Sequence, residues 1–219
     1  MPEQTITRGL GRGGREPTQR RSIAPPRGSM VVLTPDEILA VLKVARANSN
    51  RNGAMILLAY RHGLRASEIC DLKIGDLDMK AGCLSIRRLK GSLHTVQPLY
   101  RHKGQPLLDE QKALRTWLRD RDPDGSDYLF TSQKGGRLHR SQFFRLFQAC
   151  AEAAGLPPGK RHPHALKHSL ATHLIAGNVN LALVKQCLGH KAIGSTMKYV
   201  AVSDSQASQA ARAAMMELY

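Results

Sequence analysis

Apolar residues recur along most of this chain with the three- and four-residue spacing of amphipathic helices. The first clear helix start is Thr34-Pro35-Asp36-Glu37, where a threonine cap precedes a proline and a glutamate can close a capping box. Gly63, Gly155 and Gly177 follow apolar runs and are typical helix stops. The predicted helices cover about residues 35–47, 52–62, 107–120, 141–154, 164–177, 180–188 and 203–218, with a short helix after Gly63. Ser141 can cap the helix that runs to Ala154, and Phe143, Phe144 and Phe147 have the spacing of core residues along it.

Other segments have the composition of strands. Residues 83–88 and 93–98 flank the turn Leu89-Lys90-Gly91-Ser92, and this arrangement predicts an antiparallel hairpin. A further short strand is predicted over residues 128–130. The chain is therefore expected to form a mostly α domain with a small antiparallel β-sheet. At 219 residues it can bury one full core but cannot hold a second large domain.

The first thirty residues differ from the rest in composition. Residues 1–30 contain Gly-Arg-Gly-Gly-Arg, four prolines and six arginines, opposed only by Glu3 and Glu16. Such a stretch cannot bury enough apolar surface to offset the entropy of ordering it, so we predict a disordered basic N-terminal arm followed by a domain over 31–219. The arm could hold DNA through counterion release, or it could be a solubilising tail.

Charge restricts the class of partner. The chain has 33 Lys and Arg against 17 Asp and Glu, a formal charge of +16, which points to a polyanion. It contains no uninterrupted apolar run of membrane-spanning length and no apolar segment near its start, so neither a membrane nor a secretion route is expected. Its four cysteines form no C-x-x-C pair, which indicates reduced thiols in a cytoplasmic protein.

The candidate chemistry lies in the last quarter of the chain. His164 and Lys167 are three residues apart and can share a helix face, while His190 and Tyr199 follow nine residues apart. Two imidazoles, an ammonium and a phenol in one place suggest phosphate chemistry. A tyrosine hydroxyl has a pKa near 10, so as a nucleophile it needs a base beside it and cations around the electrophile.

A metal site is the other reading of these histidines. His164 and His168 have the i, i+4 spacing of a metal pair. No Glu follows His164 as in H-E-x-x-H, and Lys167 would repel a dication. We therefore expect no metal and assign His168 a supporting role in the core or in orienting its neighbours.

This segment resembles the catalytic region of the tyrosine recombinases, or phage integrases. That family carries His-x-x-Arg followed by His, later Leu-Gly-His, and a nucleophilic Tyr nine residues after that last His. The matching residues here are His164, Lys167 and His168, then Leu188, Gly189 and His190, then Tyr199. Lys167 departs from the pattern, because it stands where the family usually has its second arginine.

Further positions extend the resemblance. The family begins its active site with a motif similar to Gly63-Leu64-Arg65-Ala66-Ser67-Glu68, which makes Arg65 the first catalytic arginine and Glu68 the supporting acid. Lys90, in the predicted hairpin turn, matches the family's hairpin lysine. Outside the family context, Arg65 and Glu68 could be a structural ion pair and Lys90 a solvent-exposed turn residue.

The resemblance implies a transesterification. Tyr199 would attack a backbone phosphorus and leave a 3′-phosphotyrosyl bond and a free 5′ hydroxyl, so no cofactor is expected. His164 would accept the tyrosine proton, and Lys90 would protonate the leaving oxygen. The nonbridging oxygens would be neutralised by Arg65, Lys167 and His190.

Basic and polar residues outside this set are candidates for DNA contact. The helix predicted over 141–154 is similar to a recombinase helix that lies in the major groove of DNA. Its first turn could reach phosphates and base edges there. The predicted DNA-binding residues are Arg140, Ser141, Gln142, Arg145, Lys160 and Arg161. A solvated helix start is the alternative.

The resemblance also bears on assembly. Thirty arginine-rich residues cannot form the core-binding domain that precedes most recombinase catalytic domains, so the chain resembles catalytic-domain-only members such as the fimbrial DNA-inversion recombinases. The implied partner is double-stranded DNA. The implied active assembly is a homotetramer on paired sites, formed from free monomers or dimers of a cytoplasmic, DNA-associated protein of a mobile element. The segment 203–218 could dock on a neighbouring subunit or pack on its own.

Two other functions remain open at this point. One is a DNA-binding protein of this fold that has lost cleavage, which Lys167 makes credible. The other is a nicking-closing enzyme similar to type IB topoisomerases, which shares the chemistry without pairing DNA sites.

Overall fold

The computed structural model describes residues 30–88, 94–122, 126–200, 212 and 215–216. The predicted arm (but for Met30), Lys90 with its turn and most of the predicted helix over 203–218 lie outside these residues. The helices described are α1 (Pro35–Asn48), α2 (Asn50–Arg61), α3 (Ala66–Asp71), α4 (Glu110–Asp120), α5 (Arg140–Ala153), α6 (His164–Ala176), α7 (Leu181–Leu188) and α8 (Gly194–Met197). The strands are β1 (Leu77–Asp78), β2 (Cys83–Ile86) and β3 (Thr95–Pro98), and 3₁₀ turns lie at Ile74–Asp76, Pro106–Leu108 and Pro158–Lys160.

The first two helices begin where their caps are. The Thr34 hydroxyl accepts from the Glu37 N–H at 3.2 Å, and the Glu37 carboxylate accepts from the Thr34 N–H at 2.8 Å, so the predicted capping box forms. Ser49 caps α2, which begins two residues before the prediction. Residues 53–59 of α2 are all buried, so this helix lies inside the domain between its neighbours.

The sheet is antiparallel in the order β1-β2-β3, which confirms the predicted hairpin. The two-residue β1 was not predicted, because an alternation pattern cannot be recognised in so short a segment. The strand predicted over 128–130 is wrong, since only Tyr128 makes a bridge, to Lys73. Leu129 instead donates its N–H to the Leu72 carbonyl at 2.7 Å and accepts from the Trp117 indole at 2.9 Å.

α5 corrects two details of the prediction. His139, not Ser141, caps the helix, because its ring accepts from the Ser141 N–H at 3.3 Å. Phe143 and Phe147 are buried as predicted, since positions four apart share a face. Phe144 lies on the neighbouring face and is 43% exposed, so its prediction as a core residue is wrong.

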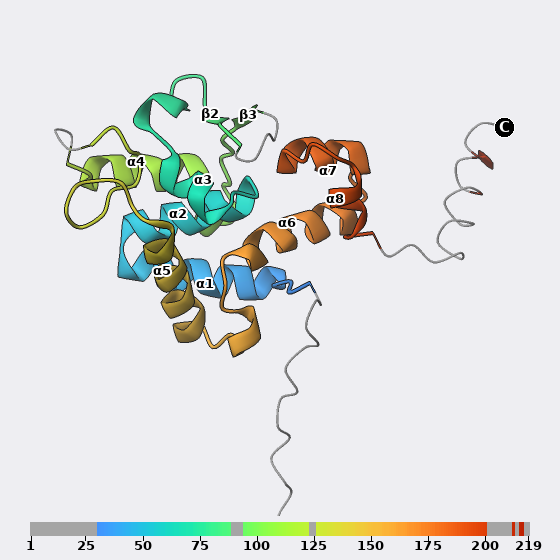
Figure 1. Ribbon diagram of the computed structural model, residues 1–219, viewed down its shortest axis with the longest axis horizontal. Coiled ribbons are helices and arrows are strands. Elements are labelled where there is room, and N and C mark those ends of the chain that lie inside the picture. The colour runs from blue at the N-terminus through green and yellow to red at the C-terminus, as the bar shows by residue number, and fades with distance from the viewer. Residues whose placement is uncertain (1–29, 89–93, 123–125, 201–211, 213–214, 217–219) are drawn as a thin grey trace, which may run out of the picture.

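Two separate clusters of buried apolar side chains hold the molecule together. The main core draws on α1 to α6 and the sheet. α7 and α8 lie apart from it in Figure 1, at the far end of α6, which joins the two regions. We call α7 and α8 with the residues up to Val200 the C-terminal unit. Its buried apolar residues, with those of α6, are Leu170, Ala171, Val184, Leu188 and Tyr199. None of the described helices has both the length and the apolar character needed to cross a bilayer.

Candidate active site

One face of α6 carries the candidate residues of this helix. Positions three and four apart point to the same side, so His164, Lys167 and His168 lie together as predicted. The ring centroids of His164 and His168 are 6.5 Å apart. Lys167 is buried, whereas His164 is exposed and His168 is half-buried.

Tyr199 follows α8 closely and turns back onto α6. Its side chain is 8% exposed, and its hydroxyl lies 2.8 Å from Nδ1 of His168. The imidazole of His190 stacks on the Tyr199 ring with centroids 6.5 Å apart and planes 11° apart. His190 is itself held at Nδ1 by the Thr196 hydroxyl at 2.9 Å. The fold therefore brings Tyr199, His168 and His190 together, with His168 as the hydrogen-bond partner of the phenol.

The electrostatics of this group oppose proton transfer from tyrosine to histidine in the DNA-free site. Burial raises the pKa of the Tyr199 hydroxyl, and the positive charge of Arg65 opposes that rise. Burial, and then the charge of Lys198, lowers the pKa of His168 to about 4. His168 is therefore neutral near pH 7 and can accept a hydrogen bond from the Tyr199 hydroxyl.

Arg65 is placed at the start of α3 by its pairing with Glu68. The Arg65 guanidinium lies 2.6 Å from the Glu68 carboxylate, which also accepts from the Arg65 backbone N–H at 2.8 Å. Burial alone would raise the pKa of Glu68, but this backbone bond and the charge of Arg88 hold it below its usual value. The Arg65 charge also lowers the pKa of His164 and His190, after the larger effect of burial for both, so Arg65 lies in the same site.

Lys167 is only 5% exposed and donates from Nζ to the Leu188 carbonyl at 2.9 Å. Burial, and then the charges of Arg88 and Arg65, lowers its pKa to about 7. An arginine would keep its charge at this position, because its pKa is above 12. The lysine instead titrates close to neutral pH, so its charge depends on what occupies the site.

Arg88 is a residue of this region that the sequence prediction missed. Its buried guanidinium lies 3.3 Å from the Glu68 carboxylate and donates to the backbone carbonyls of His62 at 2.8 Å and Gly63 at 3.1 Å. The sequence did contain a signal for its burial. Leu84, Ile86 and Arg88 are two residues apart, so they face the same side of an extended chain, and the first two are core residues. A charged residue that continues an inward-facing row is a candidate for a buried ion pair.

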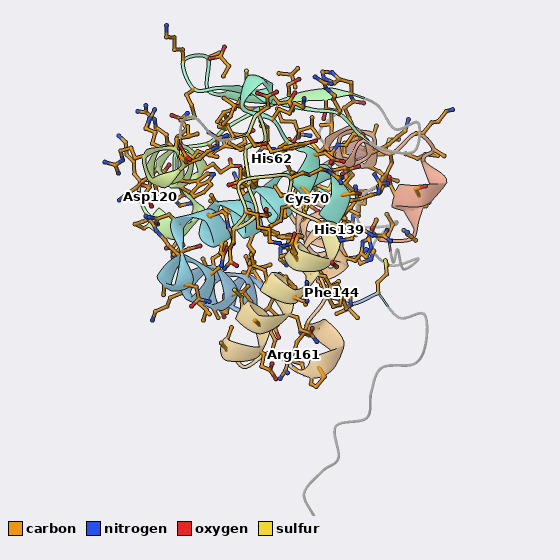
Figure 2. All side chains as sticks on the ribbon, turned by 60° about the vertical axis from the view of Figure 1, so that its left-hand side comes forward. His62, Cys70, Asp120, His139, Phe144 and Arg161 are labelled. Carbon is orange, nitrogen blue, oxygen red and sulfur yellow. The ribbon has the colours of Figure 1, made fainter. Side chains whose placement is uncertain are left out.

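The predicted DNA contacts divide into two groups. Arg140, Ser141 and Arg145 are exposed on the first turns of α5, and Gln142 is half-buried because it closes the cap on His139 at 2.8 Å. Figure 2 shows His139 and Phe144 along this helix and Arg161 beyond its far end.

Lys160 and Arg161 already have partners within the chain. Lys160 pairs with Glu37 at 2.7 Å. Arg161 pairs with Glu152 and donates to the Leu156 carbonyl at 2.7 Å. Lys160 thus joins segments 123 residues apart, whereas the partners of Arg161 are five and nine residues before it. The contribution of both residues to DNA binding stays a prediction.

Lys90 lies outside the described residues, although both strands that flank its turn are described. Within the described part of the chain, no three His, Cys, Asp or Glu side chains gather into a group that could hold a metal ion.

Comparison with known proteins assigns the sequence of this chain to a family of recombinases. The family model described as "Phage integrase family" matches residues 31–206. The chain is 36% identical over 175 residues to the type 1 fimbriae regulatory protein FimE of Escherichia coli, covering 77% of this chain and 84% of FimE. It is 32% identical over 189 residues to tyrosine recombinase XerA of Pyrococcus furiosus, covering 84% of this chain and 62% of that protein.

Solved structures agree with the sequence relatives. The crystal structure of XerA recombinase has a TM-score of 0.68 at 28% identity and covers 84% of this chain. XerH site-specific recombinase bound to its difH substrate, in a pre-cleavage complex, has a TM-score of 0.69 at 27% identity and covers 83% of this chain. The chain spans 65% of the XerA chain and 53% of the XerH chain, so it corresponds to only part of each.

Proposed function

Since this chain belongs to the phage integrase family and is a tyrosine recombinase, we propose that Tyr199 is the nucleophile with which it cuts and rejoins DNA. The observation that carries the proposal is the hydrogen bond of the Tyr199 hydroxyl to His168, beside His190 and within the field of Arg65. The chain has four other tyrosines. Tyr60 also pairs with a histidine, His173 at 2.9 Å, but in the contact region between the two apolar clusters.

The proposed reaction conserves bond energy. The Tyr199 oxygen forms a bond to a backbone phosphorus, the bond from phosphorus to the 5′ oxygen breaks, and the phosphorus remains on the 3′ side as a phosphotyrosine. The phenol proton goes to a histidine, and the leaving 5′ oxygen takes a proton from Lys90. Rejoining reverses these steps with a 5′ hydroxyl as the nucleophile, so the balance requires no ATP.

Cations would stabilise the charge that develops on the nonbridging oxygens. Arg65 is oriented for this by Glu68, and His190 by Thr196. Preorganised donors of this kind cost little reorganisation in the transition state, which is why they contribute strongly to catalysis. A phosphate beside Lys167 would raise the pKa of its ammonium from about 7, so DNA itself would charge this lysine.

The geometry changes the residue that we propose as the acceptor of the tyrosine proton. His164 was the expected acceptor, but His168 is the histidine that lies 2.8 Å from the Tyr199 hydroxyl. A general base must be within hydrogen-bond reach of the proton it takes. We propose that His168 accepts the proton in this arrangement, and that His164, on the same face, donates to a nonbridging oxygen or takes over when Tyr199 moves toward DNA.

Double-stranded DNA is the proposed substrate, as in the XerH complex. The exposed Arg140, Ser141 and Arg145 would enter the major groove with α5, with no acidic residue in the first turn to oppose them. The high positive charge of the chain supports tight, salt-dependent binding. We further propose that the active assembly is a homotetramer on paired DNA sites. The enzyme would belong to a mobile element and would be a cytoplasmic protein associated with the nucleoid.

A covalent-adduct assay tests the proposal. The protein is incubated with supercoiled DNA that carries the sequences flanking its own gene, denatured, and analysed for protein-linked strands. We expect adducts from the wild type and from the matched variant Tyr60→Phe, and none from Tyr199→Phe, which should still bind DNA. Persistent adducts in Tyr199→Phe would refute the assignment. Rearrangement at a specific site, rather than relaxation alone, would separate a recombinase from a nicking-closing enzyme.

A second candidate follows from Lys167. A lysine that is buried, bonded to the Leu188 carbonyl and titrating near pH 7 is a weaker phosphate ligand than a bidentate arginine. This observation favours a DNA-binding protein with little or no cleavage. The same assay decides, because such a protein would bind the DNA without forming adducts in the wild type.

A further inference from the structure

The end of α7 is fastened by side chains from three other segments. The last carbonyls of a helix have no partner within the helix and need donors from elsewhere. The Cys187 carbonyl accepts from Arg88 at 2.8 Å and from Gln97 at 2.9 Å. The next carbonyl, of Leu188, accepts from Lys167 at 2.9 Å. Donors from the β2 end, from β3 and from α6 therefore meet at two adjacent peptide groups.

The orientation of Gln97 is fixed by a chain of polar groups that runs inward to the buried His62 and Glu110. Because a carbonyl only accepts, the group that faces Cys187 must be the Gln97 amide nitrogen. The Gln97 oxygen then faces Nδ1 of His62 at 2.7 Å, so Nδ1 must carry a proton. The other imidazole nitrogen of His62 lies 2.7 Å from the fully buried Glu110 carboxylate, which keeps the ring in place.

Arg88 holds the same carbonyl from the opposite strand of the hairpin. Its guanidinium is anchored by Glu68 and by the carbonyls of His62 and Gly63, so it has little freedom. A Cβ atom on Gly189 would lie 2.8 Å from the Arg88 side chain. Gly189 also has a φ of +64°, so glycine suits both the conformation and the close approach.

We propose that Gln97 and Arg88 are positioning residues, a clamp on the Cys187 carbonyl that sets His190 and Tyr199 in place relative to the β2–β3 hairpin. His190 follows Cys187 by three residues, and Tyr199 stacks on His190. Lys90 lies between β2 and β3 in the sequence, so the clamp ties the segment of the proposed acid to the segment of the proposed nucleophile. This inference rests on the function proposed for Tyr199.

The test uses Gln97→Glu, which keeps an oxygen toward His62 and replaces the donor to Cys187, which also bonds to the Thr95 hydroxyl at 3.4 Å, with a second carboxylate oxygen. Gln111→Glu is the matched control, because Gln111 also donates its amide N–H to a backbone carbonyl, that of Leu99, at 2.9 Å, but from α4. At saturating DNA we expect the single-turnover rate of adduct formation to fall about tenfold in Gln97→Glu, the upper scale for one hydrogen bond. DNA affinity should be unchanged, and the control should match the wild type in both.

A second substrate separates nucleophile placement from proton delivery. A 5′-bridging phosphorothiolate has a thiol leaving group that needs no acid, so it removes the contribution of Lys90. The defect of Gln97→Glu should persist on this substrate, because Tyr199 itself is displaced. Full recovery, or a rate equal to that of Gln111→Glu, would overturn the proposal.

Hydrogen exchange supplies a readout that does not depend on cleavage. Amides of residues 186–199 should exchange faster in Gln97→Glu than in the control. They should also exchange faster in Gln97→Met, which removes the donor without adding a charge. If Tyr199 were not the nucleophile, wild type would form no Tyr199 adduct while this exchange difference would remain. Equal exchange in all of the proteins would refute the clamp.

Discussion

The main core and the C-terminal unit are held together in different ways. The main core consists of fully buried large side chains from several elements, including Phe130, Phe143 and Phe147. The C-terminal unit buries only a small apolar cluster, and Tyr199 is one of its members. Polar bonds also attach it to the rest of the domain, through the carbonyls of Cys187 and Leu188 and the hydroxyl of Tyr199. The proposed nucleophile thus belongs to the part with the least apolar packing.

α6 spans the border between these regions. Ala165 and Leu166 pack in the main core, whereas Leu170 and Ala171 pack against the C-terminal unit. His168 lies between these pairs, so its bond to Tyr199 links a rigid helix to the more weakly held unit. Regions with few apolar contacts open at lower free energy than a main core does. Arg65 and Lys167, two of the proposed phosphate ligands, project from α3 and α6, whereas the proposed nucleophile belongs to the part with fewer apolar contacts.

The largest expected effect is on the main core. Phe147→Ala should lower the free energy of unfolding by about 3–5 kcal/mol, because it leaves a cavity at a fully buried site. Leu183→Ala, at a residue of α7 that is 59% exposed, should change it by less than about 0.5 kcal/mol. Denaturant unfolding of both variants measures the difference, and similar losses would contradict the assignment of Phe147 to a fully buried core.

Removing the side-chain charge of Lys167, on α6, should lower the rate of DNA cleavage. Lys167→Ala should lower the rate on a nicked suicide substrate by about 10² to 10³, the usual scale for one transition-state donor. Lys167→Arg should keep the rate or raise it, because arginine adds bidentate geometry. Equal rates for wild type and Lys167→Ala would remove Lys167 from the active site. Cleavage by Lys167→Arg alone would favour the cleavage-deficient binder.

The junction between the main core and the C-terminal unit can be tested by a substitution that introduces strain but removes no charge. Gly189→Ala forces a side chain into a left-handed conformation, at about 1–2 kcal/mol, and also into Arg88. Gly155→Ala is the matched control, since its φ is +78° and a Cβ there would meet no atom within 4 Å. We expect Gly189→Ala to lose about 1–3 kcal/mol more stability than the control. Equal losses, measured by urea unfolding, would show that the contact with Arg88 is unimportant.

The smallest effect, taken over one pH unit, is the change in stability linked to the protonation of Lys167. Its pKa is about 7 in the folded chain and near 10.5 when unfolded, so between these values the unfolded state binds more protons. Stability from this group should therefore rise with pH from about 7 to about 10.5, by at most about 1.4 kcal/mol per unit. Lys167→Met should flatten that slope in DNA-free protein, whereas Lys43→Met, at an exposed lysine of α1, should not.

Local signals in the sequence predicted most of the fold. The Thr34 capping box and the glycine stops lie next to the residues they affect, so most helices begin and end within one or two residues of the prediction. The phenylalanine spacing of α5 was read correctly for Phe143 and Phe147 but not for Phe144. Burial of a third aromatic depends on which elements pack against the helix, which spacing alone does not specify.

The site was predicted less completely than the fold. The family pattern located Tyr199 and His190, which the fold brings together. It did not indicate that His168 holds the phenol or that Arg88 is buried, because both depend on how α8 and the hairpin pack on distant segments. The pairing of Lys160 with Glu37 has the same origin, since the partners are 123 residues apart in sequence.

The most direct test of Tyr199 as the nucleophile is to locate the covalent bond itself. The adduct on a nicked suicide substrate is digested with protease and nuclease, and the cross-linked peptide is analysed by mass spectrometry. We predict a nucleotide attached through its 3′ phosphate to Tyr199, and to no other residue. Attachment to a different side chain, or through a 5′ phosphate, would contradict the assignment of Tyr199 as the nucleophile.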